Sequence, residues 1–467
     1  MPLRRVYAPD VDFSALRSEL GLPGDYPADA LSEARESATR PRLPDRDATG
    51  IELVTVDPPG SKDLDQALHI AALSSGYRVS YAIADVAAFV SLGGPLDRES
   101  RQRGETYYSP DGRTPLYPAE LCEGAASLLP GQLRPALLWQ IDLDDRADVT
   151  AVDVRRAMVR SRAQLDYPGL QEHVDAGTAP AAVALLADVG RLRLERARER
   201  EAIGLNLAEQ DVVRDAAGHW SLELRAQLPV ETYNAEISLL TGMCAARLML
   251  DGGVGLLRTL PPADDRTVDR LRHVAATLGI AWPVGATPGD ITAAVDPATP
   301  AGASFLGYAA SLLRGAAYTA FDGAPPAQAM HAGVGAPYAH VTAPLRRLAD
   351  RFTGEVCLAL CAGTDVPADV RQTLPALPAL MAAADHRSHE LERAVVDLTE
   401  ATLLVDRVGD AFTGVVVESA ATHGLVALDD PPVRARCDGA ALPLGQRISV
   451  RLTAADPATR TVRFAAG

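Results

Sequence analysis

The last part of the chain changes pattern, and this change constrains the architecture most. From about Ala411 onward the sequence breaks into five short alternating stretches separated by turn residues: FTGVVVE, HGLVALD, VRARC, QRISVRLTAAD and TVRFAAG. Alternation of apolar and polar residues predicts strands, and five short strands in one small segment suit a closed barrel of the OB type. We therefore expect residues 411–467 to form a separate β-barrel domain, which is locally rich in arginine.

The preceding chain mixes strand and helix patterns. IELVTV predicts a strand that ends at Asp57, and ALHIAAL with YRVSYAIADVAAFV alternates around the turn SSG, which predicts a β-hairpin. VETYNAEISLLTGMCAARLML and RTVDRLRHVAATLGI carry apolar residues at helical spacing, whereas the Pro/Gly-rich run PVGATPGDITAAVDPATPAG predicts a connection. We expect an α+β domain over residues 50–405, with mixed sheets surrounded by helices.

Residues 1–49 predict a short helical segment and a linker. One helix would run from Asp12 as N-cap to Gly21, and Pro27 would open a second through Glu36, before the linker RPRLPDRD. A small arm packed on the main domain is the favoured interpretation, and a DNA-binding helix–turn–helix is the alternative. Few basic residues favour that alternative: they are confined to the linker arginines Arg40, Arg42 and Arg46.

Composition indicates a globular chain. Its 467 residues are 47% apolar, with no apolar run of membrane-spanning length and no apolar core of a signal peptide, so we expect a cytoplasmic protein without a membrane partner. The net charge of −16 argues on its face against nucleic acid, yet a basic channel can lie inside an acidic shell. The five scattered cysteines contain no C-x-x-C pair and predict neither zinc nor disulfides.

Three carboxylates fall within nine residues between apolar segments: Asp57, Asp63 and Asp65. Carboxylate oxygens suit Mg²⁺ or Mn²⁺, and two such ions about 3.5–4 Å apart can clamp a phosphodiester during its displacement. The alternative is an aspartate-rich turn formed with Pro58 and Gly60. Spacing alone slightly favours the turn.

Two further stretches carry possible chemistry. In HAGVGAPYAHVTAPLRRLADRFTGEVCLAL, Pro344 suits the first position of a helix, which would place Arg346 and Arg347 in its first turn. Guanidinium groups at a helix N-terminus can bind phosphate, although a pair of surface arginines is the alternative. In RGETYYSPDGRTPLYP an exposed tyrosine could stack on a base or could pack beneath a loop.

Taken together, these stretches resemble the RNB domain of the RNase II and RNase R exoribonucleases. The family pattern T-I-D-P followed by D-x-D-D-A corresponds to Thr55–Pro58 and Asp63–Ala67, and its H-I-A-D-V-x-x-F-V segment to YAIADVAAFV. YAHVTAPLRRLAD corresponds to Y-x-H-F-T-S-P-I-R-R-Y-A-D. The resemblance covers roughly residues 16 to 405, and the terminal barrel resembles the RNA-binding OB module, of the ribosomal protein S1 type, that follows this domain in the family.

The resemblance implies a Mg²⁺-dependent, processive hydrolase, in which Mn²⁺ can substitute. It would remove nucleoside 5′-monophosphates from the 3′ end of single-stranded RNA threaded into the channel of a monomer. Asp57, Asp63 and Asp65 match three of the family's four acidic positions, with Asp65 the one most closely tied to chemistry. Arg346 matches the arginine that stabilises charge on the scissile phosphate. The resemblance assigns RNA contacts to Tyr108, Glu236, His340, Arg347 and Glu392.

The sequence departs from the family in three places. Gln66 stands where a fourth aspartate is expected; it can still offer a metal ligand, but the negative charge is lost. Only Leu205 and Leu207 stand in the region of a second base-stacking aromatic. The two N-terminal cold-shock barrels are missing, so we expect a wider channel mouth that tolerates duplex near the 3′ end. Gln66 also keeps open an alternative, an RNA-binding protein on a catalytically weakened scaffold.

Overall fold

A closed five-stranded barrel forms the centre of the molecule. This computed structural model describes residues 11–205, 209–214 and 218–467. The strands follow the order β1-β2-β3-β6-β7, and β1 closes the barrel by pairing in parallel with β7, whereas the other pairs are antiparallel. The expected mixed sheet is thus confirmed. The strand bounds are β1 Leu53–Asp57, β2 Gln66–Ala72, β3 Tyr77–Ala84, β6 Leu133–Leu143 and β7 Val149–Asp166.

The predicted hairpin is β2 and β3, paired in unbroken register from Gln66–Ile83 to Ala72–Tyr77. The second strand is shorter than its apolar pattern suggested. It ends at Ala84, and a single 3₁₀ turn covers Val86–Ala88. The side chain of Asp85 is buried and accepts a hydrogen bond of 2.7 Å from Arg156 of β7, so this ion pair pins the chain where the strand stops.

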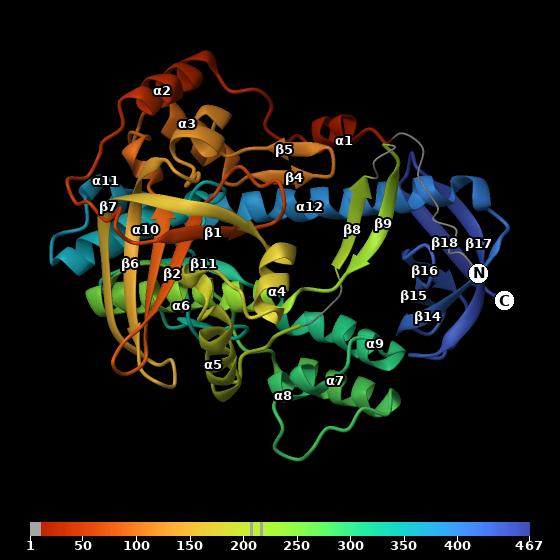
Figure 1. Cartoon of the computed structure of the whole chain (residues 1–467). Helices are drawn as coiled ribbons and strands as arrows, with labels where there is room; N and C mark the ends of the chain where they lie inside the picture. Colours follow the sequence, from red (N-terminus) through yellow and green to blue (C-terminus); the bar gives the residue numbers. More distant parts are fainter. Residues whose placement is uncertain (1–10, 206–208, 215–217) are drawn as a thin grey trace.

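Helices cover the barrel and extend away from it (Figure 1). α6 (Pro229–Gly252) and α10 (Leu348–Ala362) share the main apolar core with the barrel strands, and α5 (Leu186–Glu199) packs on α6. The 28-residue α12 (Leu377–Leu404) runs from this core to the C-terminal barrel. No helix in the described ranges has the length and apolar character needed to cross a membrane. The remaining helices around the core are α3 Pro95–Arg103, α4 Tyr167–Asp175 and α11 Ala368–Thr373.

A smaller helical cluster lies between the main core and the C-terminal barrel. It contains α7 (Asp265–Thr277), α8 (Pro288–Ala294) and α9 (Pro300–Ala309), with a separate apolar core. The Pro/Gly-rich run predicted as a connection therefore contains all of α8 and the first turn of α9. Each begins with proline in its first turn and is capped by the preceding threonine, Thr287 or Thr299, so here the prolines start helices instead of ending them.

The two predicted N-terminal helices are present as α1 (Phe13–Glu19), with Asp12 as N-cap, and α2 (Ala28–Thr39). The fully buried Phe13 packs edge-on against Trp220 with ring centroids 5.3 Å apart, so the arm is joined to the rest of the molecule. Short two-stranded sheets complete this region and its surroundings: β4 Tyr107–Ser109 with β5 Gly112–Thr114, β8 Glu209–Arg214 with β9 Trp220–Arg225, β10 Val254–Thr259 with β11 Ala317–Asp322, and β12 Met330–His331 with β13 Ala336–Pro337.

The C-terminal strands close into a second barrel in the order β14-β15-β16-β18-β17, which confirms the expected OB-type architecture. Buried and exposed residues alternate along β15 and β16, as a small barrel with one filled interior requires. Phe412 and Phe464 meet inside it with ring centroids 5.9 Å apart. The strands are β14 Ala411–Ser419, β15 His423–Leu428, β16 Arg434–Asp438, β17 Arg447–Asp456 and β18 Thr461–Ala466.

Candidate active site

Two of the predicted aspartates lie at the same end of two neighbouring strands. Asp57 is the last residue of β1, and Asp65 directly precedes β2, which pairs antiparallel with β1. Asp65 is only 3% exposed, and its Oδ1 accepts a hydrogen bond of 2.7 Å from the backbone N–H of Leu345. Oδ2 of Asp57 is buried and has no hydrogen-bond partner among the described residues. A buried carboxylate oxygen without a donor is an available ligand atom.

The electrostatics place the three aspartates and Arg346 in one cluster. Burial raises the pKa of Asp57 to about 7 and that of Asp65 to about 8. The guanidinium of Arg346 opposes both pKa shifts, and the negative charge of Asp63 adds to both. Burial disfavours the charged form of a carboxylate, which accounts for the direction of both pKa shifts.

Asp63 has a different environment, because the hairpin β4–β5 covers it. Arg113 of β5 forms a hydrogen-bonded ion pair with Oδ1, and the hydroxyl of Tyr108 on β4 donates to Oδ2 over 3.2 Å. Arg113 also pairs with Glu123 at 2.6 Å. Arg113 was not among the site residues predicted from the sequence. The signal available in the sequence was the position of Arg113 across a turn from Tyr108, because a hairpin places two such residues opposite each other.

Arg346 lies at the opening of the cluster. Its Nε is 3.5 Å from Oδ2 of Asp65, and its side chain is 48% exposed, so it can reach a bound phosphate. The predicted position in the first turn of a helix is wrong, since α10 begins at Leu348. The backbone of residues 346–348 pairs instead with residues 104–106, through Thr106 N to Arg346 O and Leu348 N to Gly104 O. These tertiary bonds hold Arg347 in an extended conformation, so the helix begins only after it.

Gln66 is anchored by its amide nitrogen, which donates to the carbonyl of Thr342 over 2.5 Å. This bond leaves the amide oxygen as the atom that could contact a cation. The described residues contain no group of three His, Cys, Asp or Glu side chains arranged as a metal site. The donor set that fits a hard cation is therefore small: Asp57, Asp65 and the amide oxygen of Gln66.

Arg347 and His340 serve as internal contacts of the same loop. Nε of Arg347 donates to the buried Asp350 over 2.9 Å, and Nδ1 of His340 lies 2.6 Å from the hydroxyl of Tyr318. Burial, reinforced by the charge of Arg347, holds the pKa of His340 well below its usual value, so the imidazole is neutral. Their predicted contact with RNA stays a prediction.

The other predicted RNA-binding acids lie in two separate surroundings. Glu392 is exposed on α12 near Glu105, whose pKa is raised to about 7 by burial and by neighbouring acids that include Glu392. Glu236 on α6 is 6% exposed, and its charged neighbours are Arg193 and Arg200. Burial raises the pKa of Glu236. Tyr108, in contrast, is 48% exposed directly beside Asp63.

The two leucines that stand in the region of the family's second aromatic are Leu205 and Leu207. Leu205 is partly buried and packs against the apolar core of α7, α8 and α9, because a leucine beside an apolar cluster is stabilised by burial there. Leu207 lies outside the described residues. The described residue best placed to stack on a base near the aspartates is Tyr108.

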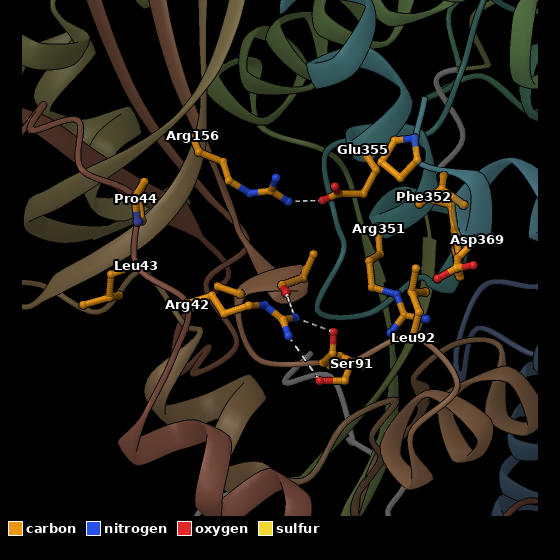
Figure 2. Close-up of a pocket in the computed structure, with 15 residues that line it drawn as sticks. Arg42, Leu43, Pro44, Ser91, Leu92, Arg156, Arg351, Phe352, Glu355 and Asp369 are labelled. Atoms are coloured by element: carbon orange, nitrogen blue, oxygen red, sulfur yellow. Dashed lines mark hydrogen bonds and ion pairs between the residues drawn. The ribbon is translucent and has the colours of Figure 1, made fainter. Parts of the chain in front are cut away.

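A pocket of about 490 Å³ lies between the linker and α10, and the aspartate cluster is not part of its lining (Figure 2). Arg42 on its wall donates to Ser91 over 3.1 Å and to the carbonyl of Val90 over 2.9 Å. Arg156 is similarly engaged by Glu355. Arg42 is one of the few basic residues on which DNA binding by residues 1–49 would rely. Because its guanidinium is engaged in these contacts, it is not free to bind DNA.

Comparison with known proteins gives the class of this fold. A model of the RNB domain matches residues 45–356, and one of the RNase II-type exonuclease C-terminal S1 domain matches residues 410–467. The chain belongs to the RNB-domain family.

Curated relatives are distant and longer. The chain is 26% identical to Ribonuclease R of Aquifex aeolicus over 88% of this chain and 60% of that protein, and 28% identical to the exosome complex exonuclease RRP44 homolog A of Arabidopsis thaliana over 73% and 38%. It thus spans less than two thirds of the length of these relatives.

Solved structures share the fold. Mycoplasma genitalium RNase R in complex with ribose-methylated single-stranded RNA has a TM-score of 0.86 at 17% identity, over 97% of this chain and 77% of that one. Yeast Ssd1, described as a pseudonuclease, has a TM-score of 0.69 at 17% identity, over 92% and 53%. The same fold therefore occurs in a nuclease and in a pseudonuclease.

Proposed function

We propose that this chain is a 3′→5′ exoribonuclease that hydrolyses single-stranded RNA to nucleoside 5′-monophosphates. The observation that carries the proposal is the pair formed by Asp65, which is buried, and Asp57, whose Oδ2 is buried, beside the exposed side chain of Arg346. The carboxylates can hold Mg²⁺, with Mn²⁺ as a substitute, and Arg346 can bind the scissile phosphate. Membership of the RNB-domain family and the RNase R relatives support this activity.

The chain's own residues would divide the work. The backbone N–H of Leu345 would orient Asp65 through its Oδ1, and Asp57 would supply a second carboxylate, of which Oδ2 is buried. When bound, the divalent ion would supply positive charge at the phosphate. Tyr108 would stack against a terminal base, while Arg347 and His340 would support the loop that carries Arg346. Glu236 and Glu392 would contact RNA farther from the cluster.

The proposed division into domains agrees with this function. Residues 50–405 would form the catalytic domain, residues 411–467 an RNA-binding barrel, and residues 1–49 a short arm. A single RNA strand enters by its 3′ end, so one channel in one monomer suffices. The likeness to structures with single-stranded and double-stranded RNA supports RNA as the substrate class.

A second candidate is an RNA-binding protein on a catalytically weakened scaffold. Gln66 favours it, because the amide removes one negative charge from the cluster, and the fold is shared with the pseudonuclease Ssd1. Incubation with 5′-labelled single-stranded RNA and Mg²⁺ or Mn²⁺ separates the two candidates. Release of mononucleotides by the wild type supports the exoribonuclease. RNA binding without product in either metal supports the binding protein.

A further inference from the structure

The hairpin β4–β5 presents two directly opposed side chains to one aspartate. Tyr108 and Arg113 are cross-strand partners, and they engage the two oxygens of Asp63 separately: Tyr108 at Oδ2 and Arg113 at Oδ1. The side chain of Asp63 is only 11% exposed, and that of Arg113 is 21% exposed. Both oxygens of this carboxylate therefore already have a donor, one of them a cation.

The other candidate ligands differ from Asp63 in this respect. Oδ2 of Asp57 has no partner within the described ranges, and Oδ2 of Asp65 has only Arg346 at 3.5 Å. The nitrogen of Gln66 is committed to Thr342, which leaves its oxygen. The three residues offer two negative charges and one neutral oxygen, and this set suits one divalent ion, since Mg²⁺ is commonly held by one or two carboxylates.

Arg113 is itself fixed from its far side. Glu123 pairs with its second nitrogen at 2.6 Å, so the guanidinium is held between two carboxylates. A planar guanidinium in such a fork is a strong and geometrically defined cation. Freeing Asp63 for a second metal would leave the Arg113 charge, already partly withdrawn from solvent, with one counter-ion fewer.

We propose that Arg113 takes the place of a second metal ion, so that the site binds a single divalent cation on Asp57, Asp65 and Gln66. The inference rests on the proposed function and refines it. Asp63 then acts as a positioning residue, because its ion pair with Arg113 holds the hairpin and Tyr108 beside the cluster. Gln66 stands where a carboxylate is expected, and Arg113 occupies Asp63. Both features reduce the number of carboxylates that are available to metal ions.

Manganese binding tests the number of ions directly. The full-length chain is titrated with Mn²⁺, bound ions per chain are counted, and electron paramagnetic resonance detects spin coupling between neighbouring ions. We expect one uncoupled Mn²⁺ in the wild type and in Arg113→Lys, which keeps the charge. Arg113→Gln frees Asp63, so a second, coupled Mn²⁺ should bind. Two coupled ions in the wild type, or a single ion in folded Arg113→Gln, would overturn the inference.

Gln66→Asp provides a test if Arg113→Gln does not fold. It restores a carboxylate while Arg113 stays in place, so we expect one ion bound more tightly, by about tenfold. Two ions in Gln66→Asp would contradict the inference. A parallel RNA assay separates this result from the proposed function: mononucleotide release with two coupled ions refutes only the single-ion site, whereas no release and no bound Mn²⁺ refutes both.

Discussion

The backbone N–H of Leu345 lies 2.7 Å from Oδ1 of Asp65, although 280 residues separate them in the chain. The loop that carries Arg346 is therefore tied directly to the most buried of the three aspartates. The donor of this bond is an uncharged backbone amide, and the other carboxylate oxygen, Oδ2, lies 3.5 Å from Nε of Arg346. The same contact positions the loop that carries Arg346, the candidate catalytic arginine, and the candidate metal ligand Asp65.

Replacement of Asp65 tests its role in hydrolysis. Asp65→Asn keeps the size of the side chain and an oxygen that can accept the Leu345 bond, but it removes the charge. We expect the rate of mononucleotide release to fall by about 10²-fold or more while RNA affinity is retained. Asp145→Asn, at an exposed turn, is the matched control and should behave as wild type. Equal activity of both variants would remove Asp65 from the reaction.

The raised pKa values predict how stability depends on pH. Asp57 and Asp65 have pKa values of about 7 and about 8, against 3.8 for an unperturbed aspartate. The native state therefore binds protons that the unfolded state has released. This contribution is complete below the unfolded pKa, and it is lost as pH rises through the folded values.

Thermal unfolding of the metal-free protein should consequently show a falling Tm as the pH rises towards 8. Added Mg²⁺ should raise Tm most at the upper end of this range, because the ion competes with protons for the same carboxylates. The double variant Asp57→Asn/Asp65→Asn should show a flatter pH profile. An unchanged profile in that variant would assign the pH dependence to other groups.

The N-terminal arm should influence substrate binding through the hairpin that carries Tyr108. Arg17 of α1 donates to Ser109 over 2.5 Å and to Oδ2 of Asp111 over 3.1 Å, at the turn of that hairpin. Arg17→Ala loses a charged hydrogen-bond pair, so we expect KM for short RNA to rise by about fivefold to tenfold, with a smaller change in kcat. Arg191→Ala, an exposed arginine paired with Asp188, serves as control. A purely structural role of Arg17 would lower Tm without moving KM.

A duplex with a 3′ overhang tests the width of the channel mouth. Two short helices, α1 and α2, and a linker precede the RNB match among the described residues, so we expect digestion to continue closer to the stem than in a relative whose RNA entry is narrowed by cold-shock barrels. The measurement is the length of the overhang left when digestion stops, compared with a full-length RNase R on the same substrate. Stalling at the same distance in both enzymes would refute the wider mouth.

Local sequence patterns predicted the strands well, because the alternation along β15 and β16 reports directly on which residues face the barrel interior. β3 is instead buried on both faces over most of its length. The position of Asp57 at the end of a strand followed from the same pattern. Three features depended on distant contacts and were missed. Arg346 lies outside α10 because its backbone pairs with residues 104–106, Leu205 is drawn into the α7–α9 core, and Arg113 meets an aspartate 50 residues earlier. Periodicity carries no information on such pairings.

The long helix α12 connects the Tyr108 hairpin with the C-terminal barrel. The helix contacts strand β4 of the Tyr108 hairpin as well as β17 and β18 of the C-terminal barrel. Its 28 residues at about 1.5 Å each span about 42 Å, and an uninterrupted helix resists changes in that distance. The helix therefore holds the Tyr108 hairpin and the C-terminal barrel at a fixed separation. Under the proposed function, only an RNA strand long enough to reach between them would contact both, and shorter fragments would bind at one of the two places.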